Sequence, residues 1–110
     1  MYKKKILIDL DGVLNIYNGK YEPDVIPDIK NGARELVENL SKNFDLYLFT
    51  TREKSLSKKW LNENKLNMYF KDITNIKIPA YLYIDDRCIC FNGDFQKLMS
   101  EINNFNVYWK

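Results

Sequence analysis

Residues 5–12 read K-I-L-I-D-L-D-G, an apolar run that ends in two aspartates and a glycine. A short apolar run closed by turn residues is typical of a buried strand. Two later stretches have the same form: Asp45 to Thr50 reads D-L-Y-L-F-T, and Ala80 to Ile84 precedes the polar residues D-D-R. Polar side chains therefore follow each predicted strand directly at its carboxyl end.

Helical patterns separate the predicted strands. After an irregular segment from Asn15 to Pro27, a helix is expected behind Asp28 as N-cap, because apolar residues recur there at helical spacing, namely at Ile29, Ala33, Leu36, Val37 and Leu40. Strands that alternate with helices indicate βαβ units. The expected fold is α/β, a three-layer Rossmann-like arrangement with a mainly parallel sheet flanked by helices. Its ligand crevice should lie at the carboxyl ends of the strands.

Weaker patterns complete this reading. A second helix is expected from a cap at Ser55 or Ser57 to about Lys65, and Met68 to Phe70 fits a short strand. Asp94 is positioned to cap a last helix that carries an apolar stripe of Phe95, Leu98, Met99 and Ile102.

Length and composition limit the function classes. The chain has 110 residues, 45% of them hydrophobic, and a net charge of +2, which is typical of one compact domain over residues 1–110. The lack of histidine excludes Ser-His-Asp and Cys-His nucleophile systems. Charges of both signs are interspersed, so the pattern does not indicate nucleic acid as a partner. The apolar run Ala80 to Ile84 is far shorter than the ~20 residues of a membrane span, so no membrane partner is expected.

The two cysteines, Cys88 and Cys90, are two residues apart in an extended segment. This spacing disfavours a disulfide between them, and two thiols without histidine do not make a zinc site. Free thiols are typical of a reducing compartment, and we expect a cytoplasmic protein.

The carboxyl ends of parallel strands meet at one edge of a sheet, so four carboxylates are expected to converge there: Asp9, Asp11, Asp85 and Asp86. Carboxylates brought together repel one another unless a cation lies among them. An all-oxygen ligand set without histidine or thiolate indicates Mg²⁺, which can share its remaining positions with a phosphate. The sequence therefore favours phosphoryl chemistry.

Residues 9–14, D-L-D-G-V-L, resemble the first motif (D-x-D-G-x) of the haloacid dehalogenase (HAD) superfamily of phosphotransferases. Thr50 resembles the Ser/Thr of the second motif, and Asp85 and Asp86 resemble the acidic fourth motif. Lys77 is matched to the third-motif lysine because it closely precedes Y-I-D-D-R, much as in small capless members of the superfamily. The resemblance covers the chain from Ile6 to about Phe95.

One departure concerns the lysine. Small capless members end in K-P…Y-I-D-D-R, whereas here the proline is displaced to give Lys77-Ile78-Pro79. Lys71 and Lys65 therefore stay open as alternatives.

The resemblance implies a role for each matched residue. Asp9 would be the nucleophile that forms an aspartyl-phosphate, and Asp11 would act as general acid and base. Thr50 and Lys77 would donate to the phosphoryl oxygens. Mg²⁺ would be held by Asp9, the Asp11 carbonyl, Asp85 and Asp86, and the candidate substrate-binding residues are Gly12, Thr51 and Arg52.

Several readings stay open at this point. A non-catalytic module that binds Mg²⁺ and phosphate, or a receiver-like regulatory domain, would also place acidic residues after buried strands. Arg52 and Arg87 fit ion-pair partners for the carboxylates better than substrate ligands. The larger aromatic residues are assigned mainly to core packing: Tyr47, Trp60, Tyr81, Tyr83 and Trp109.

No segment is long enough for the cap domain that encloses substrate in many HAD proteins. The site should therefore be open, which suits a phosphorylated small molecule or a macromolecular phosphate end. A neighbouring subunit in a homo-oligomer is another possible cover for such a site.

Overall fold

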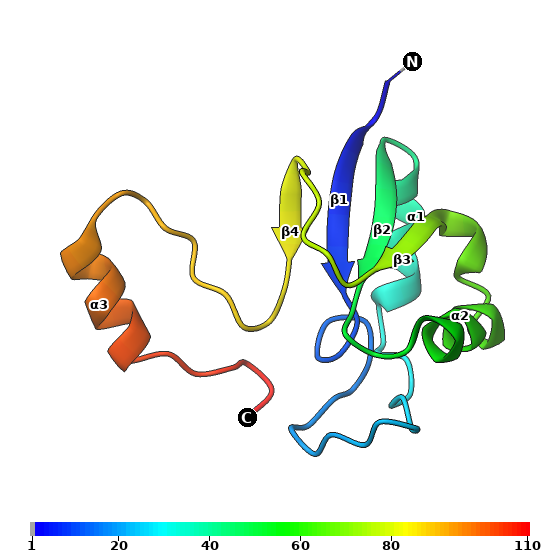
Figure 1. The fold of residues 1–110 in the computed structure, drawn as a ribbon, viewed down its shortest axis with the longest axis horizontal. Coiled ribbons are helices and arrows are strands. Elements are labelled where there is room, and N and C mark those ends of the chain that lie inside the picture. The colour runs from blue at the N-terminus through cyan, green and yellow to red at the C-terminus, as the bar shows by residue number, and fades with distance from the viewer. Residues whose placement is uncertain (1) are drawn as a thin grey trace.

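A computed structural model describes residues 2–110, which form one four-stranded sheet with helices around it (Figure 1). The strands are β1 (Lys4–Asp9), β2 (Phe44–Phe49), β3 (Phe70–Thr74) and β4 (Leu82–Ile84). The helices are α1 (Ala33–Ser41), α2 (Lys54–Glu63), the 3₁₀ turn η1 (Asn67–Tyr69) and α3 (Phe95–Asn103). The sheet order is β3-β2-β1-β4 and every pair is parallel. The predicted α/β fold with a parallel sheet flanked by helices is confirmed.

The sheet order fixes where the polar strand ends meet. β1 lies between β2 and β4, with Asp9 opposite Phe49 and Ile8 opposite Ile84. The residues that follow these strands are Thr50 on one side of β1 and Asp85 on the other. The topology therefore brings three of the predicted polar clusters to one sheet edge.

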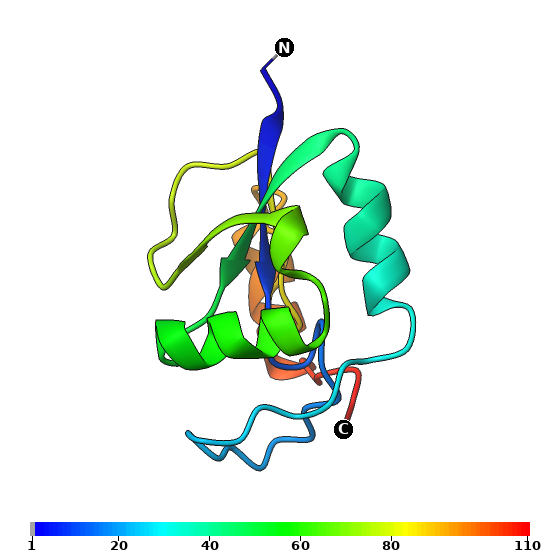
Figure 2. The same cartoon turned by 90° about the vertical axis from the view of Figure 1, so that its right-hand side faces the viewer.

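One hydrophobic core joins β1, β2 and β3 to α1 and α2. Side chains from the sheet, both helices and the adjoining turns form a single buried cluster: Ile6, Ile8, Leu10, Leu14, Ala33, Val37, Leu46, Leu48, Trp60, Leu61, Leu66 and Ile73. Figure 2 shows α1 alongside the strands and α2 below their carboxyl ends. Burial of about a dozen such side chains, each contributing about 1.5–3 kcal/mol, is the main force that holds the sheet edge in place.

The helix starts differ from two of the sequence predictions. α1 begins after Gly32, not at Asp28, because Ile29 is held extended in an antiparallel bridge with Asn15. α2 begins after Glu53, and the Ser57 hydroxyl donates to the Glu53 carbonyl inside the first turn. The cap at Asp94 is confirmed: its carboxylate accepts hydrogen bonds from the backbone N–H groups at the start of α3.

The strand predicted at Met68 to Phe70 is shifted. Residues 67–69 form η1, and the strand β3 starts at Phe70. The turn follows Lys65, whose positive φ of 56° reverses the chain after α2. A left-handed residue at this point was not foreseen, because glycine is the usual residue there.

The chain beyond β4 leaves the sheet, and we call its residues 85–106 the arm. α3 stands apart from the sheet in Figure 1, none of its residues is buried, and the C-terminus returns toward the carboxyl ends of the strands. The apolar stripe of α3 is largely exposed, with Phe95 at 73% and Met99 at 57%. Within residues 2–110, no helix is long and apolar enough to cross a membrane.

Candidate functional site

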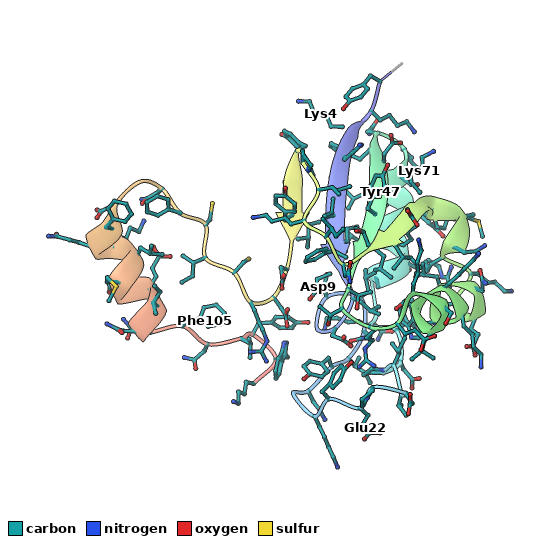
Figure 3. All side chains as sticks on the ribbon, viewed as in Figure 1. Lys4, Asp9, Glu22, Tyr47, Lys71 and Phe105 are labelled. Atoms are coloured by element: carbon teal, nitrogen blue, oxygen red, sulfur yellow. The ribbon has the colours of Figure 1, made fainter. Side chains whose placement is uncertain are left out.

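Three carboxylates meet where β1 and β4 end. Asp9, Asp85 and Asp86 each offer an oxygen within 4.8 Å of the others, and all three residues are half-buried. Asp9 is the last residue of β1, and the other two follow β4 directly. Figure 3 labels Asp9 at this edge, in the space between β1 and the start of the arm. The predicted convergence of these three residues is confirmed.

The environment of Asp9 disfavours its charged form. Burial is the largest cause, followed by the negative charges of Asp85 and Asp86 and a hydrogen bond with Asp86, and together they raise the pKa of Asp9 to about 8. Among residues 2–110, no lysine or arginine forms an ion pair with any of the three carboxylates. The cluster therefore has an excess of negative charge that the protein itself does not neutralise.

Asp11 does not join this cluster, and the expectation that four carboxylates converge is wrong in this respect. Its carboxylate accepts hydrogen bonds from Arg52 Nε at 2.8 and 3.1 Å and from Asn15 Nδ2 at 3.0 Å. The Asp11 side chain is 20% exposed, whereas that of Arg52 is 1% exposed. Asp11 is thus held by a buried cation and stays accessible from solvent.

Arg52 ties the loop between β1 and α1 to the end of β2. Its Nη1 donates to the carbonyl of Glu22 at 2.8 Å, and its guanidinium lies 4.6 Å from the centroid of the Tyr21 ring. Figure 3 labels Glu22 in this loop, below the end of β1. The prediction that Arg52 pairs with a carboxylate is confirmed. Its Nη2 atom is buried without a hydrogen-bond partner, so the N–H groups on this nitrogen are unused.

Arg87, the other predicted ion-pair partner, has a different contact. Its guanidinium lies 5.4 Å from the centroid of the Trp109 ring, and within residues 2–110 it forms no ion pair. The Asp85 carboxylate instead accepts the backbone N–H of Arg87 at 3.0 Å. Arg87 therefore contributes its backbone to the turn that carries the acidic pair.

Thr50 and Thr51 lie at the end of β2, as predicted. Thr50 is buried at 6% exposure, and its hydroxyl oxygen accepts the backbone N–H of Arg52 at 3.2 Å. Since this hydroxyl acts as an acceptor in that bond, its hydrogen remains free to donate elsewhere. Both threonines and Arg52 also line an open cavity of about 440 Å³ at the ends of β2 and β3. This cavity adjoins the site but does not include the three carboxylates.

The three candidate lysines occupy different places. Lys77 Nζ lies 4.7 Å from the centroid of the Tyr83 ring, and Tyr83 is two residues before Asp85 on the same face of β4. Lys71 Nζ lies 4.0 Å from Asp45 at the start of β2, and Figure 3 shows Lys71 well away from Asp9. The Lys65 carbonyl accepts a hydrogen bond from Arg34 at the end of α2. Of the three, Lys77 is the one that contacts a residue of β4, the strand that leads to Asp85.

Gly12 lets the chain pass close to the acidic turn. Its φ is 83°, and a Cβ built on it would lie 2.1 Å from Asp86 Oδ2 and 2.9 Å from Trp109 Nε1. A side chain at this position would therefore enter the space that Asp86 and Trp109 occupy. The predicted role for Gly12 as the sharp turn beside the site agrees with this geometry.

We expect Gly12→Ala to be damaging for two separable reasons. The left-handed backbone should cost about 1–2 kcal/mol, and the added methyl group should displace Asp86. Gly32→Ala is the matched control, because Gly32 has a φ of 90° with nothing within 4 Å of its Cβ position. Urea unfolding should show a larger loss for Gly12→Ala than for Gly32→Ala. Equal losses would mean that the contact with Asp86 adds nothing.

Two residues at the site were not foreseen. Asn15 is fully buried; its side-chain amide donates to Asp11, and its side-chain oxygen accepts the N–H groups of Gly12 and Tyr17, each at 3.1 Å. Trp109, assigned from the sequence to the core, donates its indole N–H to Asp86 Oδ2 at 2.5 Å. An asparagine close behind D-x-D-G is a sequence pattern that could have indicated Asn15. Nothing in the sequence pointed to Trp109, because it lies 23 residues from its partner.

The donor set fits a hard divalent cation. Three carboxylates within 4.8 Å of one another provide only oxygen ligands, which Mg²⁺ prefers, and no cation of residues 2–110 forms an ion pair with them. Burial and the charges of Asp85 and Asp86 raise the pKa of Asp9, and a bound cation would offset both effects. Asp11 is occupied by Arg52, so its carboxylate is not a member of this ligand group.

No protein-family model matches this chain, and no curated protein matches it. In three dimensions it is similar to the solved structure of a conserved protein from Bacteroides thetaiotaomicron, with a TM-score of 0.61 over 94% of this chain and 92% of that one. The two sequences are 20% identical, so this likeness shows the fold alone. These comparisons therefore assign no activity to this chain.

Proposed function

We propose that this protein is a Mg²⁺-dependent phosphatase of the HAD type, which hydrolyses a phosphomonoester through an aspartyl-phosphate. The observation that carries the proposal is the meeting of Asp9 with Asp85 and Asp86 at the ends of β1 and β4, where no lysine or arginine of the described residues pairs with them. The match of residues 9–12 to D-x-D-G supports it independently.

In the first step, an Asp9 carboxylate oxygen attacks phosphorus, and the bond between phosphorus and the leaving oxygen breaks. Asp11 takes up a proton from the solvent that reaches it and gives this proton to the leaving oxygen, so the alcohol departs neutral. Thr50 and Lys77 would donate to the phosphoryl oxygens as charge moves onto them. Asp9 must be ionised to attack, and Mg²⁺ held by Asp9, Asp85 and Asp86 supplies the positive charge that favours this form.

In the second step, Asp11 takes a proton from water, and the water oxygen attacks phosphorus. The bond to Asp9 breaks, inorganic phosphate leaves, and Asp11 releases the proton to solvent, so both aspartates return to their starting states. The fixed position of Asp11 suits this double role, because Arg52 and Asn15 orient its carboxylate while solvent still reaches it. The role of Arg52 in this proposal is to orient Asp11, and Thr51 and Gly12 border the approach of substrate.

An open site follows from the short connections. Residues 15–29 and 75–81 join the elements around the site without a domain inserted between them. Substrates whose phosphate projects from a larger body are therefore favoured, whether a small phosphomonoester or the phosphorylated end of a macromolecule. We place the protein in the cytoplasm on the strength of its two free thiols.

The proposal predicts hydrolysis of an aryl phosphate in millimolar Mg²⁺, loss of this activity in EDTA, and recovery when Mg²⁺ is restored. Acid quenching during turnover of a ³²P-labelled substrate should leave label on the protein, in a bond that hydroxylamine cleaves. Full activity in EDTA would contradict the role of the metal. Turnover without a labelled protein would contradict the aspartyl-phosphate.

A further inference from the structure

The C-terminal tail, residues 107–110, is bound at the candidate site. Val107 is buried at 7% exposure, although the arm before it is largely exposed. The Tyr108 hydroxyl donates to the Gly12 carbonyl, in the turn that follows Asp11. Figure 1 shows this end of the chain coming back toward the sheet, below the carboxyl ends of β4 and β1. The tail therefore adds side chains to a site that is otherwise built from the strand ends and their turns.

Trp109 is the tail residue that contacts the acidic turn. Its indole N–H donates to Asp86 Oδ2 at 2.5 Å, and its ring meets Tyr17 edge-on with the centroids 5.3 Å apart. Gly19 lies against the six-membered part of the ring, where an added Cβ would be 3.1 Å from Trp109 Cζ3. The indole is thus packed between the loop after β1 and the acidic turn after β4, and its orientation is set on both sides.

The chemistry of this donor suits a cation site. A lysine or arginine bound to Asp86 would cancel its charge and repel an incoming cation. An indole N–H is neutral, so it orients the carboxylate and leaves the full negative charge available. Groups that hold a metal ligand in this way commonly change metal affinity by about 10–100-fold when they are removed.

We propose that Trp109 is a positioning residue that holds Asp86 for Mg²⁺ binding. The inference rests on the proposed function for the metal, but it concerns affinity for the ion and can be tested without substrate. It assigns a function to one residue of the C-terminal tail: the Trp109 indole supports the metal site from outside the ligand group.

The test compares Trp109→Phe with Tyr108→Phe by calorimetric titration with Mg²⁺ alone. Phenylalanine at 109 keeps an aromatic ring against Tyr17 but lacks the N–H. Tyr108→Phe is the matched control, because it removes a hydrogen bond of the same tail that goes to the Gly12 backbone and not to a carboxylate. We expect Mg²⁺ affinity to fall by about 10-fold or more in Trp109→Phe and to stay near the wild-type value in Tyr108→Phe.

Intrinsic fluorescence gives a second measurement. The protein has two tryptophans, and the indole of Trp60 donates to the Pro27 carbonyl instead of contacting a carboxylate. Mg²⁺ should change the emission of the wild type with the dissociation constant found by calorimetry. The change should be absent in Trp109→Phe, and its persistence there at full amplitude would overturn the inference.

The outcomes separate this inference from the proposed function. Equal Mg²⁺ affinity in the wild type and Trp109→Phe overturns the positioning role and leaves the phosphatase proposal standing. Equal losses in Trp109→Phe and Tyr108→Phe overturn it too, because they would reflect docking of the tail in general. Mg²⁺ binding that depends on Trp109 in a protein without phosphatase activity supports the inference and contradicts the proposed function. A wild type that binds no Mg²⁺ overturns both.

Discussion

In EDTA at pH 8, Asp9→Asn should melt at a higher temperature than the wild type, and in millimolar Mg²⁺ it should show no phosphatase turnover. The folded protein raises the pKa of Asp9 from 3.8 to about 8, mainly by burial and then by the charges of Asp85 and Asp86. Asparagine has nearly the shape of the protonated carboxyl and cannot ionise. The substitution thus removes a group that the metal-free fold keeps at a cost, and it removes the nucleophile at the same time.

The sign of the pH dependence follows from linkage. Below pH 4 the carboxyl is protonated in both the folded and the unfolded chain, so Asp9 causes no loss of stability. Between pH 4 and 8 the unfolded chain loses this proton and the folded one retains it, so the wild type becomes less stable as the pH rises. Asp9→Asn has no carboxyl at this position, so its stability does not fall with pH for this reason. The difference in melting temperature should therefore grow from pH 4 to 8.

Mg²⁺ should reverse the order of stability. The ion binds only the folded state, so saturating Mg²⁺ should raise the melting temperature of the wild type more than that of Asp9→Asn. Asp45→Asn is the control, since Asp45 lies at the opposite end of β2 from the site. A variant Asp9→Asn that melts below the wild type in EDTA at pH 8 would contradict the environment assigned to Asp9. Turnover that survives the substitution would exclude Asp9 as the nucleophile.

The strand ends could be predicted because they depend on local patterns. Apolar runs that end in polar residues identified β1, β2 and β4, and the rule that parallel strands share an edge then brought Asp9 beside Asp85 and Asp86. These inferences need the residue pattern and the handedness of crossovers, and both are general properties of α/β folds.

The side-chain partners could not be predicted in this way. Asp11 and Asp9 are two residues apart, yet Asp11 turns to Arg52, which lies 41 residues further along the chain. The loop that includes Glu22 holds Arg52 in that position through its carbonyls, and no periodicity encodes such a contact. Trp109 was missed for the same reason. Its aromatic character indicated burial, but its partner depends on the course of the arm after β4.

The partnership with Arg52 changes what is expected of Asp11→Asn. From the sequence alone this substitution would remove a general acid and leave the fold intact. In the structure it also removes the charge that pairs with the Arg52 guanidinium. The Arg52 side chain is 1% exposed, so this cation is buried. An uncharged partner should cost about 1–3 kcal/mol, because the buried cation keeps weaker hydrogen bonds and loses its counter-charge. Turnover should fall by about 10²–10⁴-fold, the usual effect of losing a general acid and base.

A double-mutant cycle with Arg52→Met separates the two effects of Asp11→Asn. If the ion pair stabilises the fold, urea unfolding of both single variants and the double variant should give a coupling of about 0.5–3 kcal/mol. Asp11→Asn should lower turnover in the Arg52→Met background too, but by less than in the wild type, because Arg52→Met already removes a group that orients Asp11. A coupling near zero would contradict the structural role of the pair. A double variant with the turnover of Arg52→Met alone would mean that Asp11 only holds Arg52, and that another group supplies the proton to the leaving oxygen.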